Sequence, residues 1–319
     1  MALGSNHVTK TTADKFIPEI WSDEIIAAYK KNLVAANLFS KMTFKGKKGD
    51  TLHIPKPTRG EASVKAASTQ VTLITATETE VQVLVNKHYE YSRLIEDIVE
   101  VQALSSLRKF YTDDVGYALS KQVDTDLLRL GRLLNSGSWN GTDATFTYAN
   151  AYLASDGSTA FDPTANTNTG NEAAIADAGI RRAIQRLDDN DVPMTDRFFV
   201  IPPSTRNEIM GLERFTEQAF VGEVGAQNTI RNGQIGDIYG VKVFVSTNCD
   251  TATTAGAGDV NPRIALLAQK DAFVLVEQLG VRSQTQYKQE YLGTLFTSDM
   301  LYGVKEVRPE NAVALAVLG

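Results

Sequence analysis

The chain has 319 residues, a formal net charge of −6 and one cysteine, Cys249. The acidic balance excludes a protein whose main task is to hold DNA through many phosphate contacts, and the single cysteine excludes an intramolecular disulfide framework and fits a reducing cytoplasm. Hydrophobic residues make up 43% of the chain, enough for a sizeable core, but no apolar run approaches the roughly 18 residues of a membrane span. Residues 1–15 lack an apolar stretch of signal-peptide length, so secretion by that route is not expected.

The charge is distributed unevenly along the chain. Residues 1–90 hold twelve Lys and Arg residues against nine Asp and Glu residues, a net charge of +3, so the remainder carries −9. Two interpretations stay open. A basic front and an acidic back attract each other between copies of the chain, or the charge is solvated and serves solubility.

The first 57 residues predict an arm, a helix and two extended pieces. Residues 1–15 are polar and indicate a mobile arm, and Ser22 is a suitable N-cap for the helix that follows. Residues 44–57 then predict two extended pieces around a Gly-Lys-Lys-Gly-Asp turn. The helix itself is indicated by apolar residues near helical spacing: Trp21, Ile25, Ile26, Tyr29 and Leu33.

Residues 43–90 predict a long two-stranded β-ribbon with little apolar surface. Residues 59–80 are mostly Thr, Ala, Ser and charged, and then Val81, Val83 and Val85 alternate with polar residues. Such a ribbon is marginal in water by itself, because it has little core to bury. We therefore expect the ribbon to lie on another surface, and on a second subunit if its own domain does not cover it.

The strongest helix prediction follows the ribbon. It starts near Ile95 or Ser105 and stops at Ser136-Gly137, a length of about 30 residues or about 45 Å at 1.5 Å per residue. One long apolar face indicates a spine that supports a sheet, whereas strict heptads of a coiled coil are not sustained. That face consists of Val115, Ala118, Leu119, Val123, Leu127, Leu130 and Leu134.

The second half of the chain mixes helices and strands. After a loop or short-strand insertion at 137–170, a helix is predicted over 172–189 with Asn171 as its cap. A buried strand over 197–203 leads into a short helix that ends near Leu212, where Thr205 and Glu208 have capping-box spacing. Residues 248–262 predict an exposed tip, and the strands "RIALLAQ" and "AFVLVEQL" precede further extended segments.

Three glycines, Gly233, Gly236 and Gly240, raise the question of a nucleotide site. A dinucleotide fingerprint runs from strand to glycines to helix, but here the glycines lead into a strand over 241–245. We favour glycines that supply positive φ before a strand over glycines that bind phosphate.

Other candidate sites are weak. His7, His53 and His88 have no metal-ligand spacing, so surface roles are favoured, and Cys249 is read as a free thiol although a nucleophile stays open. Asp124 and Asp126 lie two positions apart on the long helix and do not face each other as a catalytic pair. The acidic run at 188–191 marks a helix end rather than a calcium loop. No active site assembles, and neither an enzyme activity, a cofactor nor a metal is expected.

The order of these parts resembles the major capsid protein of tailed bacteriophages, whose HK-ninety-seven-type fold is shared with encapsulins. Three stretches look like that family. "TETEVQVLVNKHYEYSRLIED" resembles the return strand of its ribbon, and "IGDIYGVKVFVST" resembles the strand entry of its axial domain. "SDMLYGVKEVRPENAVALAV" resembles its closing strands, with a Tyr-Gly pair before an Arg-Pro-Glu turn. The resemblance covers residues 16–319.

The resemblance implies an α+β fold with an N-terminal arm, an extended β-ribbon (the E-loop), a long spine helix, and peripheral and axial domains. The arm and short helix would occupy 1–42 and the ribbon 43–90. The peripheral domain would hold 91–170 and 276–319, and the axial domain 171–275. The expected contacts between subunits are Lys45, Lys47, Lys48, Arg59, Lys65, Val81, Val83 and Val85.

The resemblance also implies a function. The chain would assemble into the hexamers and pentamers of an icosahedral phage head, built in the host cytoplasm and present in the virion. Partners would be other copies, a separate scaffolding protein, a portal at one vertex, packaged DNA without sequence-specific binding, and optionally a cement or decoration protein, with no membrane. An encapsulin-like compartment is the alternative, and a nucleotide-dependent enzyme is a third hypothesis. No lysine–asparagine cross-link carries over, because Lys65 has no identifiable partner.

Overall fold

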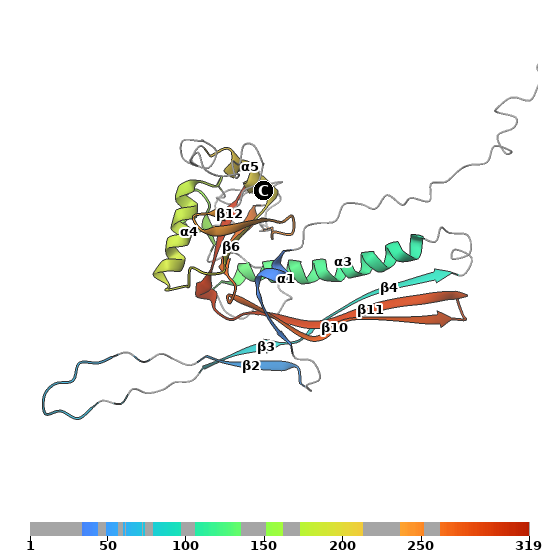
Figure 1. Cartoon of the computed structure of the whole chain (residues 1–319), viewed down its shortest axis with the longest axis horizontal. Coiled ribbons are helices and arrows are strands. Elements are labelled where there is room, and N and C mark those ends of the chain that lie inside the picture. Colours follow the sequence, from blue (N-terminus) through green and yellow to red (C-terminus); the bar gives the residue numbers. More distant parts are fainter. Residues whose placement is uncertain are drawn as a thin grey trace, which may run out of the picture.

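A computed structural model describes residues 34–43, 49–56, 60, 62–71, 73, 79–96, 106–134, 151–161, 173–212, 237–251 and 262–318. This part of the chain forms a four-stranded sheet, a six-stranded sheet and a separate two-stranded ribbon. Figure 1 shows the long four-stranded sheet with one helix along it, the ribbon on its other side, and helices α4 (Asp177–Asp189) and α5 (Pro203–Met210) beside the six-stranded sheet at one end. The expected α+β architecture is confirmed.

The four-stranded sheet is built on one long hairpin. Strands β10 (Phe273–Lys288) and β11 (Gly293–Glu306) pair antiparallel, and β4 (Lys87–Glu96) pairs antiparallel with β11. Strand β1 (Ser40–Thr43) adds to the other edge in parallel with β10. Ile95 lies in β4, so the spine helix starts later than the first of the two expected positions.

The spine helix α3 (Ser106–Arg129) runs along one face of this sheet and ends in a 3-10 turn, η2 (Leu130–Leu133). Its predicted apolar face is confirmed, because every predicted position on it is buried except Ala118, which is half-buried. These side chains pack in one cluster with aromatic residues of the sheet, including Tyr89 and Tyr302. The helix therefore serves as the spine that the sequence indicates.

The six-stranded sheet has the order β5-β12-β9-β6-β8-β7 and both of its faces are covered. In β6, Phe198 and Val200 join the cluster around α3, whereas Phe199 and Ile201 join a second cluster with α4 and α5. A sheet covered on both faces explains why its central strands read as continuous apolar runs. The bounds are β5 (Ala151–Leu153), β6 (Arg197–Ile201), β7 (Asp237–Ile238), β8 (Val241–Val245), β9 (Arg263–Gln269), β12 (Ala312–Val317), α4 (Asp177–Asp189) and α5 (Pro203–Met210).

Two strands that lie outside residues 171–275, β5 and β12, belong to the six-stranded sheet. Strand β12 pairs with β9, and β5 pairs with β12, so residues 151–153 and 312–317 belong to the six-stranded sheet. The domain division inferred from the resemblance grouped both with the spine helix. Sequence order does not show this, because strands close in sequence are not always neighbours in a sheet.

Helix α4 begins at Asp177, five residues after the predicted start. The backbone N–H of Ile175 donates to the Glu208 side chain, and that of Ala176 donates to the Ala154 carbonyl. These tertiary bonds hold residues 175–176 outside the helix, while the predicted cap, Asn171, lies outside the described residues.

The predicted capping box of the short helix is wrong. Pro202 is the N-cap of α5, and Pro203 occupies its first turn, where a missing N–H costs nothing. Thr205 therefore lies inside the helix, and its buried hydroxyl has no hydrogen-bond partner among the described residues. Glu208 binds the chain before α4 instead of its own helix.

Candidate assembly site: the ribbon, its root and the spine helix

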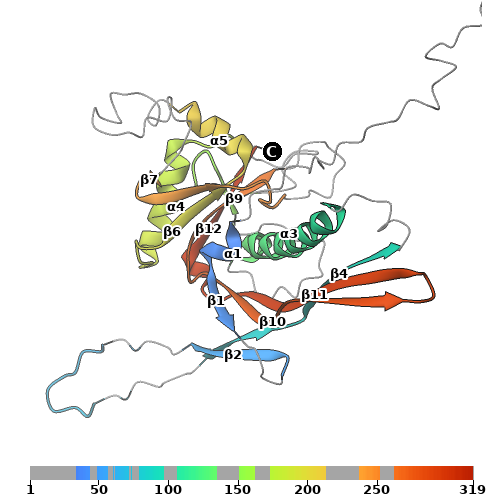
Figure 2. The ribbon, with the colours of Figure 1, turned by 45° about the vertical axis from the view of Figure 1, so that its right-hand side comes forward.

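The ribbon consists of β2 (Thr51–Lys56) and β3 (Thr79–Leu84), which pair antiparallel from Thr51 opposite Leu84 to Lys56 opposite Thr79. The predicted two-stranded ribbon is thus confirmed, although residues 87–90 belong to β4. Figure 2 shows it on the face of the four-stranded sheet opposite α3, as Figure 1 does. The sheet therefore has the spine helix on one side and the ribbon on the other.

The root of the ribbon is packed on its own subunit. Val83 and Val85 are buried against Val274 and Val276 of β10 in a small separate cluster. Val81 is half-buried. The side chains of Val83 and Val85 thus pack in the core of their own chain, because alternation along β3 and into Val85 turns them toward the sheet beneath, while their expected contact with another copy stays a prediction.

Gly303 allows the ribbon to approach the sheet closely. A Cβ at this position would overlap the carbonyl oxygen of Leu84 and lie 3.1 Å from the Cα of Val85. Its neighbour Tyr302 points to the opposite face, where the hydroxyl donates to Asp126 at 2.8 Å. The Tyr-Gly pair of the sequence thus has one residue for each face of the sheet, since successive strand residues point to opposite sides.

The far part of the ribbon is exposed. Residues 62–71 turn at Ser68, which has a φ of 63°, and Thr69 Oγ1 donates to the Ala66 carbonyl at 2.8 Å. Apolar side chains stand in solvent there, with exposures of 101% for Val64, 65% for Val71 and 89% for Leu73. Lys65 is exposed beside them. This subunit leaves these groups uncovered.

Asp126 of α3 is a buried ionic centre beneath the sheet. Its carboxylate lies 2.9 Å from the Lys87 ammonium, and the two side chains are only 2% and 11% exposed. It also accepts hydrogen bonds from Tyr302 at 2.8 Å and from the Gln122 amide at 3.1 Å. Burial, and next the nearby Asp126 charge, raise the pKa of Tyr302, so the phenol stays protonated and keeps donating.

Asp124, two positions before Asp126 and on the other side of the same helix, binds two distant segments. Its Oδ1 accepts the backbone N–H groups of Val34 and Ala35 at 2.9 and 2.7 Å, at the start of α1 (Ala35–Leu38). Its Oδ2 accepts the Asn248 side-chain amide at 2.9 Å. Both aspartates are buried charged residues of a helix whose other buried positions are apolar, and this pattern is the sequence signal for them.

The remaining predicted contact residues are less informative. Lys45, Lys47, Lys48 and Arg59 lie outside the described residues.

Gly240 has a φ of +78° immediately before β8, which confirms a turn into a strand, whereas Gly233 and Gly236 are not described. His53 and His88 are more than half exposed and pair with Glu80 and Asp299.

Cys249 is buried, and so are Asn248 and Asp250 beside it, which corrects the expectation that the tip starts at residue 248. Burial raises the pKa of the Cys249 thiol to about 12. A thiol of that pKa is not a nucleophile at neutral pH, because the thiolate is the reactive form. Among the described residues no group of His, Cys, Asp and Glu is placed to hold a metal, and no described helix is long and apolar enough to span a membrane.

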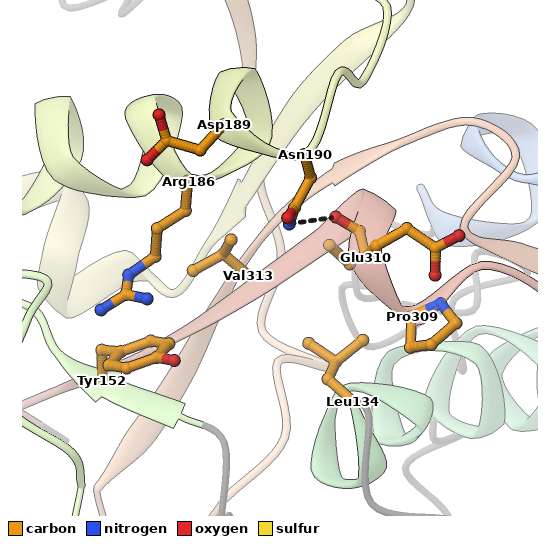
Figure 3. A pocket seen from close by; sticks show the side chains of 9 residues that line it. Leu134, Tyr152, Arg186, Asp189, Asn190, Pro309, Glu310 and Val313 are labelled. Carbon is orange, nitrogen blue, oxygen red and sulfur yellow. Dashed lines mark hydrogen bonds between the residues drawn. The ribbon is translucent and has the colours of Figure 1, made fainter. Parts of the chain in front are cut away.

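A cavity of about 260 Å³ lies where α4 meets the turn at 309–311 (Figure 3). The Arg186 guanidinium stacks 3.6 Å from the centre of the Tyr152 ring, and its Nε donates to the Gly157 carbonyl. The Asn190 amide donates to the Glu310 carbonyl at 3.3 Å. These contacts join α4 and the residue after it to β5 and to the turn at 309–311 before β12, so several elements meet at the cavity wall.

Residues 102–315, more than half of the chain, match a family model described as phage capsid protein. The chain belongs to the phage capsid protein family. It is a structural, shell-forming major capsid protein whose copies associate into the capsid, and its place is the virion. An encapsulin-like compartment is not favoured. No curated protein matches this capsid protein in sequence at a significant level.

Solved phage structures share the fold of this capsid protein over nearly its whole length. One from Mycobacterium phage Che8 is 22% identical, covers 94% of this chain and 97% of that chain, and has a TM-score of 0.69. The capsid of the cyanophage P-SCSP1u is 19% identical, with coverages of 99% and 96% and a TM-score of 0.73. That of the cyanophage Pam1 is 14% identical, with coverages of 99% and 100% and a TM-score of 0.72.

Proposed function

We propose that this capsid protein builds the hexamers and pentamers of an icosahedral phage head around double-stranded DNA, and that the ribbon tip joins neighbouring copies. The main support for this proposal is that Val64, Val71 and Leu73 are exposed on a ribbon whose root is packed against its own sheet. Apolar side chains gathered on a projecting segment are typical of an interaction site, because their burial in a partner is favourable.

Within this proposal the expected contact residues have different roles. The exposed Lys65 contacts an acidic surface of the neighbour, as do Lys45, Lys47, Lys48 and Arg59, and the half-exposed Val81 lies at the edge of the contact. Val83 and Val85 hold the root. The peripheral domain corresponds to the four-stranded sheet with α3, and the axial domain to the six-stranded sheet with β5 and β12 included.

The other partners are also part of the proposal. The net charge of −6 favours a shell that encloses DNA without binding a particular sequence. Assembly takes place in the host cytoplasm on a separate scaffolding protein, with a portal at one vertex and an optional cement or decoration protein. The role is architectural, and the chain carries out no reaction in it.

Deleting part of the ribbon tests the contact. Removing residues 59–75 should leave a soluble, folded subunit, because the described residues of this segment bury nothing in their own domain. Electron microscopy of the variant expressed with its scaffolding protein should show no stable shells. A matched control is Met194→Ser, which removes another exposed apolar side chain, 76% exposed, from the body. Normal shells from the deletion variant would overturn the proposal.

A further inference from the structure

The ribbon is held firmly at one end. At the root, the Val85 N–H donates to the Asp50 carbonyl at 2.7 Å, and the Gln278 side chain donates to the Gly49 carbonyl at 3.0 Å. The first bond joins the two arms of the ribbon to each other, and the second joins the segment before β2 to β10. Val83 and Val85 add an apolar contact at the same place.

Beyond the root, the ribbon stands away from the body. A cavity of about 640 Å³ separates Ile54, Lys56 and Val81 of the ribbon from Val192 and Arg308 of the body. Across it, Lys56 and Glu310 form an ion pair of 3.6 Å between side chains that are 49% and 38% exposed. An exposed pair of this kind contributes about 0–1 kcal/mol, so it does not fix the direction of the ribbon.

Lys87 lies at the point where the chain passes from the ribbon into the sheet. It is the first residue of β4, three positions after the last residue of β3. Its ammonium is paired with Asp126 in the buried layer between α3 and the sheet. The spine helix therefore binds the chain immediately after the ribbon ends.

On the opposite face of the sheet, a close backbone contact holds the ribbon in place. Gly303 of β11 lets the Leu84 carbonyl rest against the sheet backbone, and the adjacent Tyr302 binds Asp126. The Lys87–Asp126 ion pair on one face of the sheet and the Leu84–Gly303 backbone contact on the other thus lie at the same position along the strands.

We propose that Lys87, Asp126, Tyr302 and Gly303 form a positioning layer that sets the angle at which the ribbon leaves the subunit. This inference rests on the proposed function, because the ribbon angle matters where the tip contacts a neighbouring copy. The angle then determines where the neighbour lies, and with it the curvature of the shell. These are positioning residues that act through the ribbon.

A distance measurement on the unassembled subunit tests the layer directly. Spin labels are attached to cysteines introduced by Thr79→Cys at the end of the paired ribbon and Gln185→Cys on α4, and the distribution of distances between them is recorded. The native Cys249 is buried and stays unlabelled. Lys87→Met removes the cation, Lys87→Arg keeps it, and Gly303→Ala adds a methyl group under the ribbon.

We expect Lys87→Met and Gly303→Ala to shift or broaden the distance distribution, and Lys87→Arg to restore the unsubstituted one. Gly116→Ala is the control, because a Cβ at this position in α3 meets nothing within 4 Å. Circular dichroism and melting temperature establish that each variant folds. If Lys87→Met does not fold, the distance distribution of Gly303→Ala tests the inference alone, because this substitution leaves no charge unpaired. An unchanged distribution in folded variants would overturn the inference. Because the subunits are unassembled, this outcome is independent of the ribbon deletion that tests the proposed function.

Discussion

The carboxylate of Asp124 lies 2.9 Å from the side-chain amide of Asn248, which is 124 positions further along the chain. The same carboxylate accepts the backbone N–H groups of Val34 and Ala35. One buried residue of the spine helix therefore joins the start of α1 to the loop that follows β8. Buried polar groups with their partners in place specify one arrangement of the surrounding elements. Asp124 therefore fixes relationships between parts that the sequence keeps far apart.

Replacing Asp124 by alanine should destabilise the subunit strongly. Three donors lose their acceptor in a buried place, and each unsatisfied donor costs about 1–3 kcal/mol. Denaturant unfolding measures the loss, which we expect to reach about 3 kcal/mol or more. Asp113→Ala is the control, since Asp113 lies exposed on the same helix. Equal stability of the two variants would contradict this account.

Cys249 should not react in the folded protein. The thiol is 4% exposed and burial raises its pKa to about 12, so neither access nor the thiolate is available at pH 8. An aromatic disulfide reagent should therefore titrate no thiol in native subunits and one after denaturation, because the chain has a single cysteine. Rapid reaction of native protein would show that this region opens.

Glu306 should make stability depend on pH. Burial, and next the neighbouring Glu310, raise its pKa to about 7 from the ordinary value of 4.5, and its Oε2 has no hydrogen-bond partner among the described residues. Between pH 4.5 and 7 the folded state binds more protons than the unfolded state. The free energy of unfolding contributed by this group therefore falls as the pH rises through that window.

Glu306→Gln removes this ionisation. Its melting temperature should exceed that of the unsubstituted protein above pH 7, and the difference should disappear below pH 4.5. Glu290→Gln, at an exposed position, is the control and should show no such trend. A difference that is the same at pH 4 and pH 8 would mean that the charge of Glu306 is not responsible.

Charge in the segment before the ribbon should affect assembly. Replacing Lys45, Lys47 and Lys48 together by Glu reverses three basic charges within residues 1–90, the part of the chain that carries +3. Light scattering should show slower assembly at low salt, with the difference shrinking as salt is added, because exposed charges are screened beyond about 10 Å at 0.1 M. Lys270→Glu, on an exposed turn of the body, is the control. Assembly that is insensitive to salt in the triple variant would remove electrostatics from the contact.

The ribbon was predictable from the sequence only in part. Its two strands and its poverty in apolar groups were predictable from the alternation of Val81, Val83 and Val85 and from the Thr-rich run before them. That it splits into a packed root and an exposed tip was not, because the covering residues Val274 and Val276 lie nearly 200 positions away and belong to another predicted strand. Likewise, the spine helix was predicted, but the partners of its two aspartates were not.

The sequence alone determined the elements, because periodicity, glycines and prolines act over a few residues: the apolar face of α3, the strand after Gly240 and the continuous apolar runs of β6 and β9. The tertiary structure decided which strands share a sheet, where α4 begins and what the buried charges bind. The physical reason is that hydrogen bonds such as that from Ile175 to Glu208, and close contacts such as that of Leu84 with Gly303, depend on atoms far apart in the chain and exist only once the elements are packed.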